Sequence, residues 1–327
     1  AKLRRITRFL TLTNAYRLFS QRSCLTPKGD RYLRLLRLKK NAVNVAVFWS
    51  GCIVSAAKKL LESLYFEVIP MTGFEEKLDV LKAGDRVGIT CSPKQGLQVT
   101  LDTVSKLSDR GFSLTPHLAA RQVMNKQHLR DIVSQLTDSG ITSIFVPGGD
   151  LDEPMGEYDS SAAVLRDLAE MDHPFTRIGV ASYPEGHPAI SEDLLFEALS
   201  AKQAIATHMV TQMCFDMPVL IKWLSEMRDR GITTPVWIGL PGVMDRMRLF
   251  RTSLGIGVGQ SAKYAKKQKG LIGMFLRSPT YKPDSLFKEL KPVMNDERMA
   301  IEGLYMFTFN QIDNTVHWSQ EQLKSII

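Results

Sequence analysis

The chain has 327 residues, of which 44% are apolar, so it can bury a core large enough for one barrel domain with an extension or for two smaller domains. Residues 1–60 hold 14 Lys and Arg and one acidic residue, Asp30, so their net charge is +13. Because the whole chain has a net charge of +8, the remaining residues have a net charge of −5. This distribution excludes a basic nucleic-acid groove in the body of the protein. The four cysteines are scattered, with no Cys-x-x-Cys pair, which predicts a reducing compartment and no metal site. They are Cys24, Cys52, Cys91 and Cys214.

Residues 1–60 are interpreted as a basic helical N-terminal extension. Residues 2–23 combine five arginines with large apolar residues and contain no acid, which is typical of a mitochondrial targeting peptide. We nevertheless favour a basic surface helix, a mis-called start or a solvated tail on a cytoplasmic protein, with a mitochondrial presequence in residues 1–25 as the alternative. Residues 41–57 are uncharged, but they are shorter than the roughly 20 apolar residues of a membrane-spanning helix. We therefore expect a helix packed on the body of the protein rather than a membrane role.

From residue 64 short apolar runs alternate with stretches that have the periodicity of amphipathic helices. The predicted strands are residues 64–69, 86–91, 112–116, 142–147, 176–182, 207–213, 234–239 and 303–309. Gly111, Gly140 and Gly231 follow three of the helices where a left-handed C-cap residue is expected. Eight strands alternating with helices predict an α/β fold, a (β/α)8 TIM barrel over residues 61–327. A longer helical insertion at residues 243–297 is predicted before the last strand.

Polar residues follow the predicted fifth strand at a sharp turn. Tyr183, Glu185 and His187 alternate with Pro184 and Gly186, and prolines cannot donate to a β-ladder. These side chains are therefore expected on a stiff loop at the carboxyl end of a barrel strand, where barrel enzymes place their active sites.

Four motifs in this order resemble the methylenetetrahydrofolate reductase family. They are Phe66–Glu67, Pro116–Leu118, Tyr183–Pro188 and Val210–Asp216. The resemblance covers residues 64–310. It implies reduction of 5,10-methylenetetrahydrofolate to 5-methyltetrahydrofolate with NADH or NADPH, through FAD in most members and by direct hydride transfer in some.

Glu67 lies in an apolar run near the end of the first strand, where burial raises a carboxyl pKa and allows proton donation near neutral pH. The alternative is a strand-end glutamate in a surface ion pair. The resemblance implies that Glu67 is the general acid that opens the five-membered ring of the folate.

Asp150 is the last residue of the motif Val146–Asp150 at the end of the fourth strand, where two glycines allow a ligand to approach the backbone. A carboxylate there can stabilise the iminium cation formed on ring opening. Flavin-bearing family members carry an arginine where this chain has Gly148, so this position departs from the flavin motif.

The resemblance implies that five further residues, together with Asp150, contact FAD. They are Thr90, His117, Tyr183, His187 and Lys202. Their hydroxyl, imidazole, phenol and ammonium groups suit the ring and phosphates of a flavin nucleotide, although each has an ordinary structural role as an alternative.

Gln212 resembles the folate-contacting glutamine of the family, and its carboxamide can both donate to and accept from a pterin. Asp216 is expected to cap the next helix. Gly255–Gly259 lacks the strand and spacing of a dinucleotide fingerprint, and we interpret it as a turn. The lysines at 263–269 favour a solvated helix over a site for a folate polyglutamate tail.

The sequence thus predicts a folate reductase whose partners are a reduced folate and a nicotinamide nucleotide, with a homo-oligomer as an open possibility. Two alternatives remain: a methyltransferase that passes the methyl group of methyltetrahydrofolate to a corrinoid protein, and a folate-binding paralogue without activity.

Overall fold

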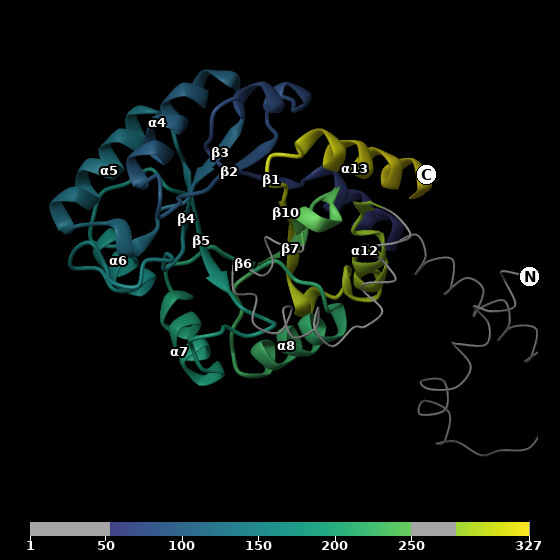
Figure 1. The fold of residues 1–327 in the computed structure, drawn as a ribbon. Helices are drawn as coiled ribbons and strands as arrows, with labels where there is room; N and C mark the ends of the chain where they lie inside the picture. Colours follow the sequence, from purple (N-terminus) through teal and green to yellow (C-terminus); the bar gives the residue numbers. More distant parts are fainter. Residues whose placement is uncertain (1–52, 250–278, 327) are drawn as a thin grey trace, which may run out of the picture. The chain divides into compact units, whose positions relative to one another are not determined.

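A computed structural model describes residues 53–249 and 279–326. Its central feature is a sheet of eight parallel strands in the order β3-β2-β1-β10-β7-β6-β5-β4. The strands are β1 (Tyr65–Val68), β2 (Arg86–Ile89), β3 (Ser113–Pro116), β4 (Ser143–Val146), β5 (Arg177–Ser182), β6 (His208–Thr211), β7 (Val236–Pro241) and β10 (Ile301–Phe307). The ends of this order meet, because the residues after β3 pair with β4: His117 bridges to Phe145, and the Leu118 N–H donates to the Phe145 carbonyl at 2.7 Å. The sheet is therefore a closed barrel (Figure 1), and all eight predicted strands are confirmed.

Helices alternate with the strands and cover the outside of the barrel. They are α4 (Leu97–Leu107), α5 (Lys126–Asp138), α6 (Ser161–Leu168), α7 (Glu192–Lys202), α8 (Met217–Asp229), α12 (Asp284–Leu290) and α13 (Ile312–Ile326). The predicted apolar faces are buried in the main core, as Leu101, Ile132 and Leu224 illustrate. Gly111, Gly140 and Gly231 have φ values of 75°, 68° and 89°, which confirms the predicted left-handed ends of three helical segments.

Some connections differ from the simple alternation. Between β1 and β2 the chain forms only a 3-10 helix, η1 (Glu75–Val80), because six residues with one buried side chain, Leu78, give too little apolar surface for a longer helix. The predicted helical insertion includes a strand pair that the sequence did not indicate, β8 (Met244–Asp245) with β9 (Thr280–Tyr281), before α12. Gly255–Gly259 and the lysines at 263–269 lie outside the described residues.

Residues 53–62 are helical, and Ala57, Leu60 and Leu61 are buried in the main core. This agrees with the expected helix on the body of the protein for the last part of residues 41–57; the rest of that segment lies outside the described residues. The domain boundary at residue 60 stays a prediction. Within the described ranges, every helix is too short or too polar to cross a lipid bilayer.

The barrel interior is aromatic and polar rather than purely aliphatic. Tyr65, Val210, Trp237 and Tyr305 form its buried cluster. At the amino ends of the strands, the Glu302 carboxylate accepts from Arg177 at 2.9 Å and from the Trp237 indole N–H at 2.8 Å. This ion pair lies at the amino ends of the barrel strands. The polar residues that follow the strands lie at the opposite, carboxyl end.

Candidate active site

Glu67 lies at the carboxyl end of β1 and is 8% exposed. In the sheet it pairs with Gly88 of β2 and Phe307 of β10. Burial raises the pKa of its carboxyl group to about 8, and a hydrogen bond with Tyr305 opposes part of that shift. The carboxyl group therefore carries a proton at neutral pH, which is the state that a general acid needs.

The segment after β10 holds the end of β1 through contacts that the sequence did not indicate. The Thr308 hydroxyl donates to the Glu67 carbonyl, while the Asn310 side chain accepts from the Ile69 N–H at 2.8 Å and donates to the Ile69 carbonyl at 2.9 Å. Phe309 and Asn310 have φ values of 47° and 62°, a left-handed conformation that costs free energy in a residue as bulky as phenylalanine. These contacts fix the backbone that carries Glu67.

Asp150, Tyr183 and His187 lie near one another at the ends of β4 and β5. Burial raises the pKa of Tyr183 to about 12, and the Asp150 charge adds to that shift. Burial lowers the pKa of His187, and the Asp150 charge opposes part of that shift. The Tyr183 and His187 rings meet edge to face with centroids 5.2 Å apart. The structure thus brings three of the predicted site residues together, and Asp150 itself is exposed to solvent.

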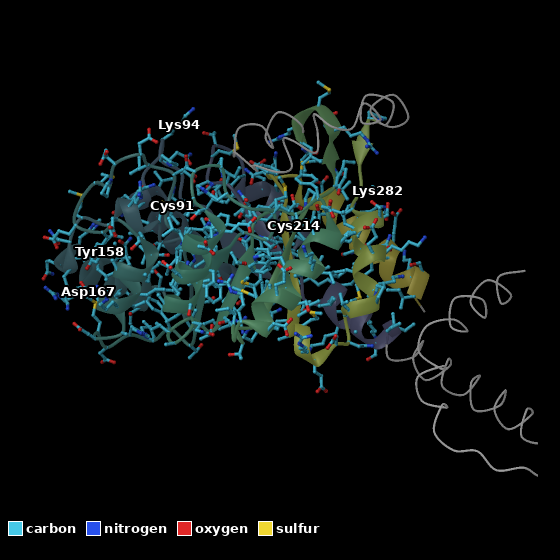
Figure 2. The ribbon with its side chains drawn as sticks, turned by 90° about the horizontal axis from the view of Figure 1, so that it is seen from below. Cys91, Lys94, Tyr158, Asp167, Cys214 and Lys282 are labelled. Carbon is cyan, nitrogen blue, oxygen red and sulfur yellow. The ribbon has the colours of Figure 1, made fainter. Side chains whose placement is uncertain are left out.

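Cys91 belongs to the same neighbourhood, because the Asp150 charge also contributes to raising the pKa of its thiol, mainly a result of burial. It is a free thiol, as is Cys214 beyond β6, and the two lie apart in Figure 2.

Thr90 and Gly148 bear on whether a flavin fits this end of the barrel. The Thr90 hydroxyl oxygen is buried and has no hydrogen-bond partner within the described part of the chain. A buried hydroxyl in that state costs free energy unless a ligand or water bonds it. A Cβ added at Gly148 would meet no atom within 4 Å, so the position opens onto free space. Both observations fit a bound group beside Asp150, although Gly148 offers it no side chain.

His117 and Lys202 are placed differently. His117 faces the barrel interior, where its Nε2 lies 2.8 Å from the Tyr305 hydroxyl oxygen, and burial lowers its pKa to about 3. Lys202 is the last residue of α7, the end that leads back to the amino end of β6; it is 7% exposed, and burial lowers its pKa to about 8. Neither makes a described contact with the Asp150, Tyr183 and His187 group.

Gln212 follows β6 directly, and its N–H donates to the Ser182 carbonyl at the end of β5 at 2.8 Å. Glu67, Asp150 and Gln212 therefore all leave the carboxyl ends of barrel strands, on one face of the barrel. Asp216 accepts from the Val219 N–H at 3.0 Å, which confirms it as the cap of α8.

Glu185 has a role that sequence reasoning did not assign. Its carboxylate is 5% exposed and accepts from the N–H groups of Phe215 and Asp216, the second at 2.9 Å. These N–H groups belong to the start of α8, where the helix dipole favours negative charge. Glu185 thereby links the loop of Tyr183 and His187 to the loop of Gln212. In the sequence, only its place inside the Tyr183–Pro188 motif indicated that it has a role.

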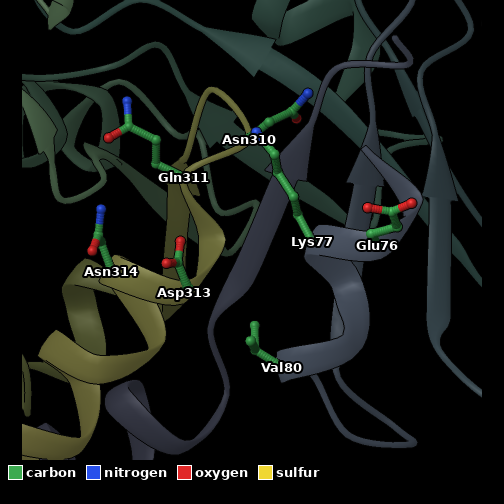
Figure 3. Close-up of a pocket in the computed structure, with 7 residues that line it drawn as sticks. All are labelled: Glu76, Lys77, Val80, Asn310, Gln311, Asp313 and Asn314. Atoms are coloured by element: carbon green, nitrogen blue, oxygen red, sulfur yellow. The ribbon is translucent and has the colours of Figure 1, made fainter. Parts of the chain in front are cut away.

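A cavity of about 460 Å³ lies between η1 and the segment that follows β10. Figure 3 shows its lining: Glu76, Lys77 and Val80 from η1, and Asn310, Gln311, Asp313 and Asn314 from the loop and first turn of α13. It adjoins the Asn310 contacts and contains none of the predicted catalytic or binding residues.

The comparisons with known proteins agree with these motifs. The family model "Methylenetetrahydrofolate reductase" matches residues 76–251. The chain is 31% identical over 142 residues to the 5,10-methylenetetrahydrofolate reductase of Pectobacterium carotovorum subsp. carotovorum, covering 41% of this chain and 44% of that protein. It is 37% identical over 71 residues to methylenetetrahydrofolate reductase 2 of Saccharomyces cerevisiae, covering 20% and 11%.

The chain spans less than half the length of these curated relatives. Among solved structures, a chitinase from Rhizomucor miehei has a TM-score of 0.43 at 11% identity, covering 80% of this chain and 99% of that one. At that score the likeness does not bear on fold or function. The family match spans more than half of the chain, and with the motifs at the carboxyl ends of β1, β3, β5 and β6 it makes the chain a member of the methylenetetrahydrofolate reductase family.

Proposed function

We propose that the protein reduces 5,10-methylenetetrahydrofolate to 5-methyltetrahydrofolate, with NADH or NADPH as the source of hydride. The observation that carries this proposal is the burial of Glu67, which raises the pKa of its carboxyl group to about 8, at the same barrel end as Asp150 and Gln212. A proton donor, a carboxylate and a carboxamide are the groups that ring opening of this substrate needs.

The chemistry divides between the three residues. Glu67 gives its proton to N10 of the folate as the bond between N10 and the bridging carbon breaks and its electron pair passes to nitrogen. The bridging carbon is then an iminium cation on N5, which the Asp150 carboxylate stabilises, and hydride addition converts it to a methyl group. Gln212 orients the pterin by donating to and accepting from its amide edge.

FAD, when bound, would relay the hydride from nicotinamide to the folate. Thr90, Asp150, Tyr183 and His187 would hold it; the unpartnered Thr90 hydroxyl supports this route. Gly148 stands where the family motif has an arginine, and the absence of that arginine favours direct hydride transfer from nicotinamide to the folate instead. An absorption spectrum of the purified protein separates the two routes, because bound flavin absorbs visible light.

The test of the reaction is incubation of the purified protein with 5,10-methylenetetrahydrofolate and NADH or NADPH, followed by mass spectrometry. We expect 5-methyltetrahydrofolate to form in step with nicotinamide oxidation, with added FAD required on the flavin route. The proposal is wrong if the folate is bound but no methyl product appears with either nucleotide, with or without FAD. That outcome would favour the non-catalytic alternative, and methyl transfer to a corrinoid protein would favour the methyltransferase.

A further inference from the structure

Tyr305 connects two titratable groups inside the barrel that no other described residue joins. It lies in β10, 2% exposed, and its hydroxyl oxygen is 2.8 Å from His117 Nε2. The same hydroxyl is a hydrogen-bonding neighbour of the Glu67 carboxyl group. Side chains from β1, β10 and the end of β3 thus form one chain of hydrogen bonds from Glu67 to His117 beneath the carboxyl end of the barrel.

The strand between β1 and β3 leaves room for this hydroxyl group. At Gly88 of β2, an added Cβ would lie 2.3 Å from the Tyr305 hydroxyl oxygen, which is closer than any real contact of that kind. Gly88 pairs in the sheet with Glu67 on one side and Thr115 on the other. A glycine at this point therefore allows the hydroxyl to reach both Glu67 and His117.

We propose that Tyr305 is the positioning residue for Glu67, and that its O–H group changes partner from His117 to Glu67 as the glutamate gives up its proton. This inference rests on the proposed function. Without substrate, the Glu67 O–H donates to the Tyr305 oxygen and the Tyr305 O–H donates to His117 Nε2; when the folate binds, the Glu67 O–H turns to N10 while the Tyr305 O–H stays on His117. Afterwards the Tyr305 O–H rotates to donate to the new carboxylate. No bond to tyrosine breaks, and Glu67 regains its proton from water between turnovers.

The protonation states agree with this arrangement. Burial raises the pKa of Glu67 to about 8, lowers that of His117 to about 3, and raises that of Tyr305 well above its usual range. Near pH 7 Glu67 is therefore a donor, His117 an acceptor, and Tyr305 a neutral phenol that can do either. The other titratable group facing Tyr305 is Tyr65 of β1, whose hydroxyl pairs with Thr115 at 3.1 Å.

The direct test is a pH titration of the Glu67 carboxyl group in the Tyr305→Phe variant of the full chain, without substrate. The infrared band of the protonated carboxyl group reports the titration. Tyr305 favours the ionised carboxyl, so its loss is expected to move the midpoint up by about 1–2 pH units. Glu67→Gln identifies the band. Tyr65→Phe, which removes a neighbouring hydroxyl with a different partner, is expected to leave the midpoint unchanged. The same midpoint in Tyr305→Phe and the wild type overturns the proposal.

Two further measurements complete the test. In the wild type, ¹⁵N NMR of His117 is expected to show a neutral ring with a proton on Nδ1 and none on Nε2 down to pH 5; a proton on Nε2 overturns the proposal without any variant. In turnover, Tyr305→Phe is expected to lower kcat about 10- to 100-fold with KM little changed, and to move the alkaline limb of the pH profile in the direction of the titration. Because the infrared and NMR readouts need no turnover, failure of the proposed reaction would leave them intact.

Discussion

Burial keeps the Glu67 carboxyl group protonated up to a pKa of about 8, whereas an unfolded chain ionises it near 4.5. Above pH 4.5 the folded state therefore holds a proton that the unfolded state has released, so this group lowers stability as pH rises towards 8. The His117 imidazole affects stability in the opposite direction, because burial lowers its pKa from 6.5 to about 3. Its contribution to stability is complete above pH 6.5 and is lost as the pH falls from 6.5 towards 3.

Glu67→Gln removes the titration and keeps the shape of the side chain. Relative to the wild type, we expect the variant's free energy of unfolding to increase by about 1.4 kcal/mol per pH unit between pH 6.5 and 7.5. Urea denaturation at several pH values measures this difference, and Glu192→Gln, an exposed glutamate in the first turn of α7, is the control. A difference that does not change with pH would mean that Glu67 is already ionised in the folded protein.

At the scale of elements, the loop after β5 and the start of α8 are joined through Glu185. Glu185→Ala leaves two N–H groups, of Phe215 and Asp216, without their partner, so we expect a loss of about 3 kcal/mol in the free energy of unfolding. Because the loop carries Tyr183 and the neighbouring segment carries Gln212, KM for the folate should also rise. Urea denaturation and steady-state kinetics measure the two effects, and an unchanged stability would show that water replaces the carboxylate at no cost.

The loop after β4 offers a matched pair of glycines. Gly148 opens onto free space, whereas Gly149 has a φ of 95° and a Cβ there would lie 3.3 Å from Ala119 Cβ. We expect Gly148→Arg to fold normally and to raise the affinity for FAD, because it restores a cation for the flavin phosphates. Gly149→Arg should lose stability through backbone strain. Thermal unfolding and titration with FAD measure these effects; weaker FAD binding in Gly148→Arg would place the flavin elsewhere.

At the scale of the whole molecule, the barrel was predictable because each parallel strand is buried on both faces and forms a short apolar run that the sequence displays locally. The positions of Glu67, Asp150 and Gln212 at the carboxyl ends of strands were predictable for the same reason, since each lies within or shortly after such a run, whereas their roles come from the family resemblance and stay predictions. The β8 and β9 pair was not predictable, because two-residue strands carry no periodicity.

The contacts of Asn310 and Tyr305 could not have been predicted from local sequence. Asn310 bonds the backbone of Ile69, 241 residues away, and Tyr305 meets His117 at a separation of 188 residues. Only closure of the barrel brings these residues together. His117 illustrates the consequence: the flavin contact that its motif implied stays a prediction, while the hydrogen bond of its Nε2 with Tyr305 inside the barrel was not foreseen.

The most direct measurement of the central claim is the rate of 5-methyltetrahydrofolate formation by Glu67→Gln relative to the wild type, at saturating folate and nicotinamide and under conditions in which both proteins are folded. Loss of a general acid is expected to lower kcat by about 100-fold or more, while the folate still binds. An unchanged kcat would contradict the account, because the proton that opens the ring would then come from another group.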